Sequence, residues 1–292
     1  AIDVVVVLTP SGLHASNVIQ LSRYKKDIMV EKPMALTLKD ADEMISACDN
    51  NGCRLFVVKQ NRFNLPVSKL YEAKTNERFG KVFLGTVRVR WSRDQSYYDQ
   101  DAWRGTWAQD GGVLTNQASH HIDLLEWLMG DVSSVFAYSS QAIAKIEAED
   151  TAVVTLKFSS GALGIIEATT ATRPRDIEGS ISILGSEGTV VIGGFSVNQI
   201  HTWEFKDQSD RDCDVLENFS ENPPNVYGFG HKRYYEHVVK CIKDKGPNLV
   251  DGLEGRKSLE LITAIYESIE TEKEVWLRFK PQNCKLGLET KK

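Results

Sequence analysis

Three short apolar segments separated by amphipathic ones constrain the fold of this chain more than any other feature. Val4–Leu8, Ile28–Val30 and Arg54–Val58 are rich in apolar residues, and helical patterns at about Leu13–Tyr24 and Thr37–Asn51 separate them. This alternation is typical of a parallel α/β sheet. The first segment is apolar on both faces, which predicts a central strand buried on both sides.

Polar clusters follow each of the three segments. Thr9-Pro10-Ser11, Glu31-Lys32-Pro33 and Gln60-Asn61-Arg62 stand at the three strand ends. Ligands of parallel α/β sheets bind beyond the carboxyl ends of the strands, so we expect these residues on one ligand-binding edge. Pro33 restricts Lys32 to an extended conformation. Partial burial there lowers the pKa of an ammonium group, which suits a general acid or base; the alternative is an ordinary surface lysine.

The second part of the chain shows a different pattern. Val87, Val89 and Trp91 alternate with two arginines, which predicts a half-buried strand. Residues 92–109 are polar and aromatic, and we interpret them as a long functional loop. An antiparallel series of strands is expected at Val135–Ile143, Thr151–Phe158, Ala162–Thr170, Ser180–Leu184, Thr189–Ile192 and Ile200–Phe205. Two helices, His231–Lys243 and Glu254–Glu270, and a strand, Val275–Phe279, complete the pattern.

The composition excludes several classes of protein. The net charge of −5 provides no general attraction to nucleic acid or to anionic membranes. No apolar run is long enough to span a bilayer. The five cysteines are scattered and show neither metal-ligand spacing nor a disulfide framework, so we expect no metal site and a reducing cytoplasm.

The stretch Asp110–Asp131 concentrates hydrogen-bonding and titrating residues at the start of an apolar helix. With about 100° per residue, a helix beginning near Asn116 has one buried apolar face, and places Asn116 and His120 together on the opposite side. We therefore expect His120 to be reactive and His121 to be a hydrogen-bonded core residue. Lys32 and His120 are expected to face one another across a cleft. In the alternative interpretation, both histidines are structural.

Several arginines are candidates for binding an anionic ligand. Arg88 and Arg90 share a strand face, and Arg104, Arg173 and Arg175 stand in or after loops. Guanidinium groups in such positions can bind phosphate. The alternative for each is a solvated face with surface ion pairs.

Together, these motifs resemble those of the glucose–fructose oxidoreductase/inositol dehydrogenase/MocA family of nicotinamide-dependent sugar dehydrogenases, over nearly the whole chain. The resemblance rests on Val5–Pro10 with His14, Glu31-Lys32-Pro33, Gln60-Asn61-Arg62 and Gly111-Gly112 with His120–Asp123. Trp103-Arg104-Gly105, Asn116-Gln117 and Asn222–Gly228 are most similar to a narrower group. These are the UDP-N-acetyl-2-amino-2-deoxyglucuronate 3-dehydrogenases of bacterial surface-polysaccharide synthesis.

The resemblance implies a fold of class α/β plus α+β. Residues 1–62 are expected to form the C-terminal part of a Rossmann parallel sheet. Residues 63–280 are expected to form a mainly antiparallel open-sheet domain with helices on one face, and residues 281–292 a tail. The open sheet is implied to serve substrate binding and assembly into a homodimer or homotetramer.

The resemblance also implies oxidation of the C3 hydroxyl of a UDP-linked N-acetylamino sugar uronic acid, with hydride transfer from the carbinol carbon to NAD. The catalytic residues are expected to be Lys32, His120 and Asn116. Asn116 stands where many members have an aspartate; an amide can orient a hydroxyl but cannot take its proton, so acid/base catalysis falls to Lys32 or His120. Cofactor contacts are expected from Thr9, Pro10, Ser11, His14, Glu31, Lys32, Gln60 and Trp103. Substrate contacts are expected from Lys32, Arg104, Asn116, Gln117, His120, Arg173 and Tyr227.

One departure from the family pattern affects the cofactor. The family's first strand, its Gly-rich phosphate-binding turn and the acidic residue that binds the ribose are not found in these 292 residues. We therefore expect either a truncated enzyme that binds NAD weakly, or a non-catalytic sugar-nucleotide-binding or scaffold remnant of the same fold. Without the ribose-binding residue, the sequence does not distinguish NAD from NADP.

Overall fold

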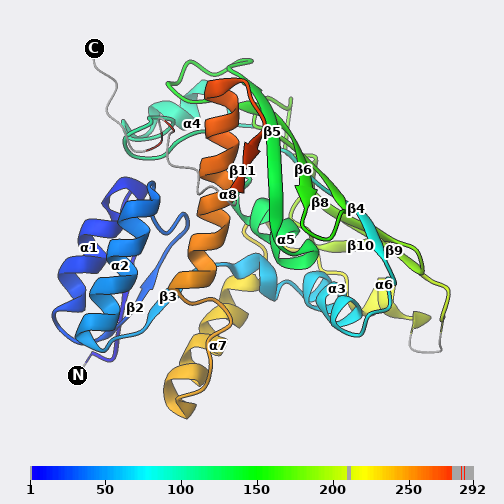
Figure 1. Cartoon of the computed structure of the whole chain (residues 1–292), viewed down its shortest axis with the longest axis horizontal. Helices are drawn as coiled ribbons and strands as arrows, with labels where there is room; N and C mark the ends of the chain where they lie inside the picture. The colour runs from blue at the N-terminus through cyan, green and yellow to red at the C-terminus, as the bar shows by residue number, and fades with distance from the viewer. Residues whose placement is uncertain (1, 209–211, 278–283, 285, 287–292) are drawn as a thin grey trace.

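The computed structural model of the chain describes residues 2–208, 212–277, 284 and 286. Its first part is a three-stranded parallel sheet in the order β1-β2-β3, as the apolar segments predict. The strands are β1 (Val4–Val7), β2 (Asp27–Val30) and β3 (Leu55–Val57), linked by α1 (His14–Ser22) and α2 (Leu38–Asn51) (Figure 1). The prediction of a central, doubly buried first strand is wrong for this sheet, since β1 lies at its edge and leaves Val6 38% and Leu8 66% exposed.

The bounds of α2 follow from local chemistry. The hydroxyl of Thr37 accepts a hydrogen bond from the backbone N–H of Asp40 at 3.1 Å, which satisfies a free donor of the first turn. Gly52 ends the helix in the left-handed region, with φ of 67°. Both ends agree with the sequence prediction.

An eight-stranded sheet forms the second part, in the order β10-β9-β8-β4-β7-β6-β5-β11. Its strands are β4 (Val82–Arg90), β5 (Val132–Ser140), β6 (Thr151–Phe158), β7 (Leu163–Thr169), β8 (Glu178–Gly185), β9 (Gly188–Gly193), β10 (Gln199–Phe205) and β11 (Val275–Trp276). β4 lies between β7 and β8 and pairs in parallel with β7, whereas the other pairs are antiparallel. The predicted continuous antiparallel series is therefore interrupted by an earlier strand.

The last predicted strand and the tail are only partly described. β11 ends at Trp276, so the end of the predicted Val275–Phe279 lies outside the described residues. Of the predicted tail 281–292, only residues 284 and 286 are described.

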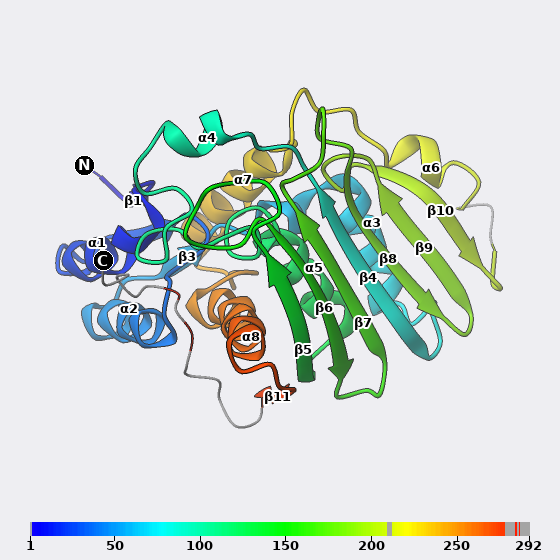
Figure 2. The same ribbon diagram turned by 90° about the horizontal axis from the view of Figure 1, so that it is seen from above.

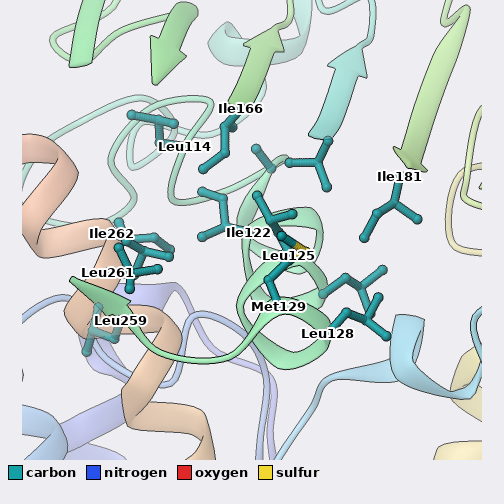
Figure 3. Close-up of a cluster of buried hydrophobic side chains, with 14 of the residues drawn as sticks. Leu114, Ile122, Leu125, Leu128, Met129, Ile166, Ile181, Leu259, Leu261 and Ile262 are labelled. Carbon is teal, nitrogen blue, oxygen red and sulfur yellow. The ribbon is translucent and has the colours of Figure 1, made fainter. Parts of the chain in front are cut away.

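Helices cover one face of the large sheet. Figure 2 shows α3 (Leu65–Thr75), α5 (Ser119–Met129) and α8 (Gly252–Thr271) on that face. The apolar side chains of α5 and α8, among them Leu125 and Ile262, belong to one buried cluster with Ile166 and Ile181 of the sheet (Figure 3). This core fixes α5, and with it the histidine pair, against the large sheet.

The remaining helices are short or lie at the border between the sheets. They are η1 (Ser11–Leu13), η2 (Gln60–Phe63), α4 (Gln95–Asp99), α6 (Val215–Asn218) and α7 (Gly230–Asp244). The segment 92–109, predicted as a loop, contains the short helix α4. No helix in the described part of the chain is both long and apolar enough to cross a membrane.

Candidate active site

The carboxyl ends of β1 and β2 are held together by a buried histidine. His14 is within hydrogen-bonding distance of the carbonyl oxygen of Pro33 through Nδ1, at 2.7 Å, and of Thr9 through Nε2, at 2.8 Å. Burial lowers the pKa of His14, although both carbonyls favour a proton on the ring. The sequence predicted His14 as a cofactor contact; its ring connects the two turns that carry Thr9 and Lys32.

Lys32 and Asn116 meet although they are 84 positions apart in the sequence. The Lys32 Nζ donates to the backbone carbonyl of Asn116 at 2.6 Å and to its side-chain Oδ1 at 3.1 Å. Burial lowers the pKa of the Lys32 ammonium, and the charges of Lys59 and Arg93 act in the same direction. Glu31 and Asp110 oppose this shift. At a given pH, a larger fraction of Lys32 than of a surface lysine is therefore the neutral amine, which can take up a proton.

Asn116 precedes the helix on which it was expected to lie. α5 begins at Ser119, and Asn116 belongs to a turn in which its N–H bonds to the carbonyl of Gly112 at 3.0 Å. The predicted helical pairing of Asn116 with His120 is therefore wrong, and the side chain of Asn116 contacts Lys32 instead. The turn requires glycine at position 112, because a Cβ there would lie 2.2 Å from the carbonyl oxygen of Glu149.

His120 is buried, together with His121, so the prediction of one buried and one opposite face on this helix is also wrong. The amide nitrogen of Gln60 lies 2.9 Å from Nε2 of His120. Because the amide NH₂ can only donate, Nε2 accepts and the neutral ring carries its hydrogen on Nδ1. Burial, reinforced by the charges of Lys32 and Lys59, holds the pKa of His120 well below its ordinary value. Nδ1 has no partner among the described residues and is a free donor.

His121 is a core residue, as predicted, but it is not hydrogen-bonded within the described part of the chain. Its ring packs edge to face against Trp91, with the ring centroids 5.7 Å apart. Burial lowers the pKa of His121 to about 4. His121 is therefore a neutral packing residue. Among the described residues, only His120 of the pair has a hydrogen-bonding neighbour at the strand ends.

Sequence reasoning missed Asp110, which lies behind Asn116. One oxygen of this buried carboxylate accepts from the Asn116 amide at 2.7 Å, and the other from the N–H of Gly105 at 2.9 Å. Burial raises the pKa of Asp110 to about 6, against the opposing effect of the Gly105 hydrogen bond and the charge of Lys32. Asp110 is the only charged residue in the stretch 110–119. That isolation beside a glycine pair was the signal available in the sequence.

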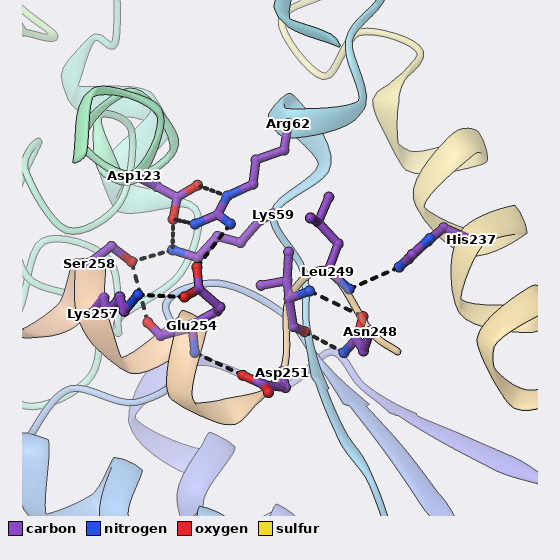
Figure 4. A network of polar contacts seen from close by, with 12 residues as sticks. Lys59, Arg62, Asp123, His237, Asn248, Leu249, Asp251, Glu254, Lys257 and Ser258 are labelled. Carbon is purple, nitrogen blue, oxygen red and sulfur yellow. Dashed lines mark hydrogen bonds and ion pairs between the residues drawn. The ribbon is translucent and has the colours of Figure 1, made fainter. Parts of the chain in front are cut away.

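A buried ionic network fixes the third strand end (Figure 4). Arg62 binds Asp123 of α5 with two hydrogen bonds of 2.8 Å and reaches Glu254 of α8 at 3.2 Å. The ammonium of Lys59 lies 3.4 Å from Asp123 and donates to Ser258 of α8. These contacts bind η2, which carries Gln60, to the two helices of the second domain.

The predicted cationic candidates divide into two groups. Arg90 pairs with Glu167 at 2.6 Å and with Glu178 at 3.0 Å, and Arg88 also pairs with both. Their charges are compensated on the strand face, so the structure favours surface ion pairs over the phosphate-binding surface predicted for these two. Arg104, in the loop, also pairs with a carboxylate, Asp101 at 2.9 Å, and its guanidinium lies 4.2 Å from the ring centroid of Tyr97.

A second arginine, which the sequence reasoning did not single out, flanks the same ring. The guanidinium of Arg93 lies 5.4 Å from the Tyr97 centroid and 2.9 Å from Asp176. Arg173, which is exposed, donates to the backbone carbonyl of Arg93 at 3.0 Å. The arginines at positions 93, 104 and 173 therefore lie in or beside one segment, residues 92–109, which we call the aromatic loop. Arg93 is close enough to Lys32 to lower the pKa of its ammonium.

Other predicted contacts lie around the strand ends. Thr9, Pro10 and Ser11 form the turn into η1, where the N–H of Gly12 bonds to Gln109 at 3.0 Å. Glu31 lies 3.5 Å from His231 of α7, a neighbour that the sequence did not indicate. Gln117 is buried, Trp103 is half-buried in the aromatic loop, and Tyr227 is 66% exposed. Arg175 is exposed.

Two family models match the chain. Residues 1–59 match the model described as an oxidoreductase family NAD-binding Rossmann fold, and residues 73–277 the model of the oxidoreductase family C-terminal alpha/beta domain. Myo-inositol 2-dehydrogenase of Thermotoga maritima is 31% identical over 94% of this chain and 80% of its own length. D-apiose dehydrogenase of Paraburkholderia graminis is 25% identical, over 95% and 73% respectively.

Solved structures give a higher identity. The WlbA dehydrogenase of Bordetella pertussis, in complex with NADH and UDP-GlcNAcA, is 44% identical with a TM-score of 0.91, over 95% of this chain and 80% of that one. The WlbA dehydrogenase of Chromobacterium violaceum, in complex with the same two ligands, is 44% identical with a TM-score of 0.88, over 94% and 77%. The likeness thus extends over both sheets and the residues between them.

Proposed function

The chain belongs to the glucose–fructose oxidoreductase, inositol dehydrogenase and MocA family of oxidoreductases, and from that premise we propose that it oxidises the C3 hydroxyl of a UDP-linked N-acetylamino sugar uronic acid with NAD. The contact of Lys32 with both oxygens of Asn116 is the single observation that carries the proposal. The contact holds a basic amine of lowered pKa at the end of a parallel strand. The two WlbA structures support the choice of substrate.

The edge where the three parallel strands end fits the nicotinamide half of NAD. It combines the turns after β1 and β2 with two buried polar atoms that have no partner in the described residues, Oε1 of Gln60 and Nδ1 of His120. A carboxamide and a ribose offer the complementary donors and acceptors. Thr9, Ser11, Glu31 and Gln60 are the residues proposed to hold the group. When bound, NAD supplies the hydride acceptor.

Lys32 is the proposed proton acceptor. A neutral amine has two hydrogens, and the two oxygens of Asn116 accept both, which leaves the nitrogen lone pair free. That lone pair can take the proton of the substrate hydroxyl as the hydrogen on the same carbon leaves as hydride. His120 cannot act in the same way from the tautomer that Gln60 selects, because its other ring nitrogen bears the hydrogen. We assign His120 to donate a hydrogen bond to the reacting oxygen.

The aromatic loop is proposed to bind the acidic part of the substrate. A UDP-linked uronic acid carries a diphosphate and a carboxylate, and guanidinium groups bind both in a bidentate manner. Arg93 and Arg104 flank the ring of Tyr97, and Arg173 donates to the backbone carbonyl of Arg93. Gln117 and Tyr227 remain proposed contacts from the resemblance.

Steady-state kinetics with NAD and several sugars test the proposal. We expect NADH formation with the UDP-linked uronic acid and much slower formation with myo-inositol or D-apiose, the substrates named for the curated relatives. Reduction of the product with borodeuteride locates the oxidised carbon. Turnover of a free sugar in preference to the nucleotide sugar, or a label at a carbon other than C3, contradicts the proposed substrate.

Substitution of Lys32 tests the proposed mechanism. Lys32→Met removes the proton acceptor, and we expect the turnover number to fall on the order of 10²- to 10⁴-fold. Lys39→Met is the matched control, because Lys39 is exposed on α2 in a surface ion pair with Glu43. If the Lys32→Met enzyme keeps its turnover number, a group other than Lys32 is the proton acceptor.

Self-association through the open sheet remains part of the proposal. Tyr138, Val153, Leu163 and Ile165 are exposed on one face of β5, β6 and β7, where Tyr138 pairs directly with Val153. An exposed apolar face of this kind is typical of an interface between subunits. Analytical ultracentrifugation measures the mass in solution, and a monomer at all concentrations contradicts it.

A further inference from the structure

A chain of hydrogen bonds leads from Lys32 through the side chains of Asn116 and Asp110 to the backbone of Gly105. The Lys32 Nζ donates to Oδ1 of Asn116 at 3.1 Å, and the amide nitrogen of Asn116 donates to Asp110 at 2.7 Å. The second oxygen of Asp110 accepts from the N–H of Gly105 at 2.9 Å. Each atom of the chain therefore has one defined role as donor or acceptor.

The chain matters because the two ends of an amide are not equivalent. With its NH₂ toward Asp110, the Asn116 side chain presents its oxygen to Lys32; turned over, it would present NH₂ to an amine that needs an acceptor. A carboxylate accepts with both oxygens and donates with neither. Asp110 therefore allows only one orientation of Asn116.

We propose that Asp110 is a positioning residue for the oxidation: it fixes the amide of Asn116 toward Lys32 and contributes, together with Glu31, negative charge that stabilises the Lys32 ammonium. The inference deepens the proposed function and rests on it for the reaction. The contact between Asp110, Asn116 and Lys32 does not depend on the identity of the substrate. Asp110 itself is not a proton acceptor for the substrate, since Asn116 and Gly105 occupy its oxygens.

The charges around Lys32 determine the sign of the expected effect. Glu31 and Asp110 stabilise the ammonium form, whereas Lys59 and Arg93 destabilise it. Glu31 also accepts from the backbone N–H of Lys32 and faces His231, so its position is fixed independently of Asn116. Removal of the Asp110 charge therefore lowers the pKa of Lys32, and the neutral amine appears at lower pH.

Two variants separate the role of Asp110 from simple stability. In Asp110→Asn, the new amide can present its oxygen to Gly105 or to Asn116 but not to both, and its NH₂ opposes the remaining donor. In the double variant Asp110→Asn/Asn116→Asp, the amide oxygen at position 110 accepts from Gly105. The NH₂ of the same amide donates to the carboxylate at position 116, whose other oxygen faces Lys32. The double variant preserves every hydrogen bond of the chain and moves the charge from position 110 to position 116.

The pKa of Lys32 is measured directly by NMR titration of the ε-carbon in protein labelled with carbon-13 lysine, with Lys32→Arg for assignment. We expect Asp110→Asn to lower this pKa, and the double variant to return it to the original value or above. This measurement needs no substrate, so it tests the inference even if no UDP-sugar is oxidised. An unchanged pKa in Asp110→Asn overturns the electrostatic role.

Kinetics of the purified enzyme with NAD test the positioning role. We expect the turnover number of Asp110→Asn to fall roughly 10- to 100-fold with little change in the KM for NAD, and the acidic limb of the pH profile to move to lower pH. The double variant should recover most of the turnover. If Asp110→Asn fails to fold, the double variant still tests the inference. A folded double variant with a turnover number far below that of the wild type overturns it.

Discussion

Asp123→Asn tests whether the buried ionic network holds the two domains together. Asp123 accepts two hydrogen bonds of 2.8 Å from Arg62 and lies 3.4 Å from Lys59, and all three side chains are at most 4% exposed. An asparagine keeps one acceptor, so one hydrogen bond to Arg62 and the Lys59 contact are lost. With about 1.5–3 kcal/mol for each bond to a charged group, we expect a loss of about 4 kcal/mol, within the range for breaking a buried pair.

The penalty of this substitution should depend on pH. Lys59 becomes a buried cation without its carboxylate, and burial already lowers its pKa. An unfolded lysine titrates near 10.4, so the folded variant releases this proton at a lower pH than the unfolded chain. As the pH rises between these two pKa values, the variant regains stability relative to the wild type. The difference should therefore be smaller near pH 9 than near pH 7.

Urea unfolding followed by tryptophan fluorescence at both pH values measures these differences. Asp42→Asn is the matched control, because the same chemical change there affects an exposed ion pair with Arg256 and should cost less than about 1 kcal/mol. A loss for Asp123→Asn no larger than that of the control would refute the role of the network. A penalty that grows with pH would refute the charge argument.

Two further predictions concern the turn that carries Asn116. Gly112→Ala places a Cβ 2.2 Å from the carbonyl oxygen of Glu149 and should lower the free energy of unfolding by at least about 1–3 kcal/mol. The control is Gly246→Ala, which has open space around it and should change the free energy of unfolding by less than about 1 kcal/mol. Urea unfolding measures both. Burial raises the pKa of Glu149 from 4.5 to about 7, so wild-type stability should fall as the pH rises through this interval. Glu149→Gln removes that loss, and its stability relative to the wild type should rise by up to about 3 kcal/mol between pH 4.5 and pH 8 in thermal unfolding; parallel pH profiles would contradict the shifted pKa.

Local patterns were sufficient for most of the fold. The parallel three-stranded sheet, the ends of α2 at Thr37 and Gly52, and most strands of the second domain agree with the prediction. Errors arose where partners are distant in the sequence. β1 was expected to be central, but strand order depends on neighbours that periodicity does not reveal. In the same way, β4 separates β7 from β8, which no local signal indicates.

The helix of the site shows the same limit at the level of one turn. Helical spacing joined Asn116 to His120, but the N–H groups of Val113 and Leu114 bond to Glu149, and the segment before Ser119 forms a turn. Asn116 then faces Lys32, and Asp110 comes to lie behind it. Periodicity describes a side chain's direction only within a regular element.

The sequence by itself determined the family and the strand ends that carry Lys32 and Gln60, and it predicted Lys32, His120 and Asn116 as the catalytic groups, because these depend on residue types at short spacing. Only the tertiary structure decided the tautomer of His120, the lowered pKa of Lys32 and the contact of Asp110 with Asn116. The reason is physical: a pKa and a hydrogen-bond direction depend on burial and on partners brought together by folding, over as many as 84 positions in the chain.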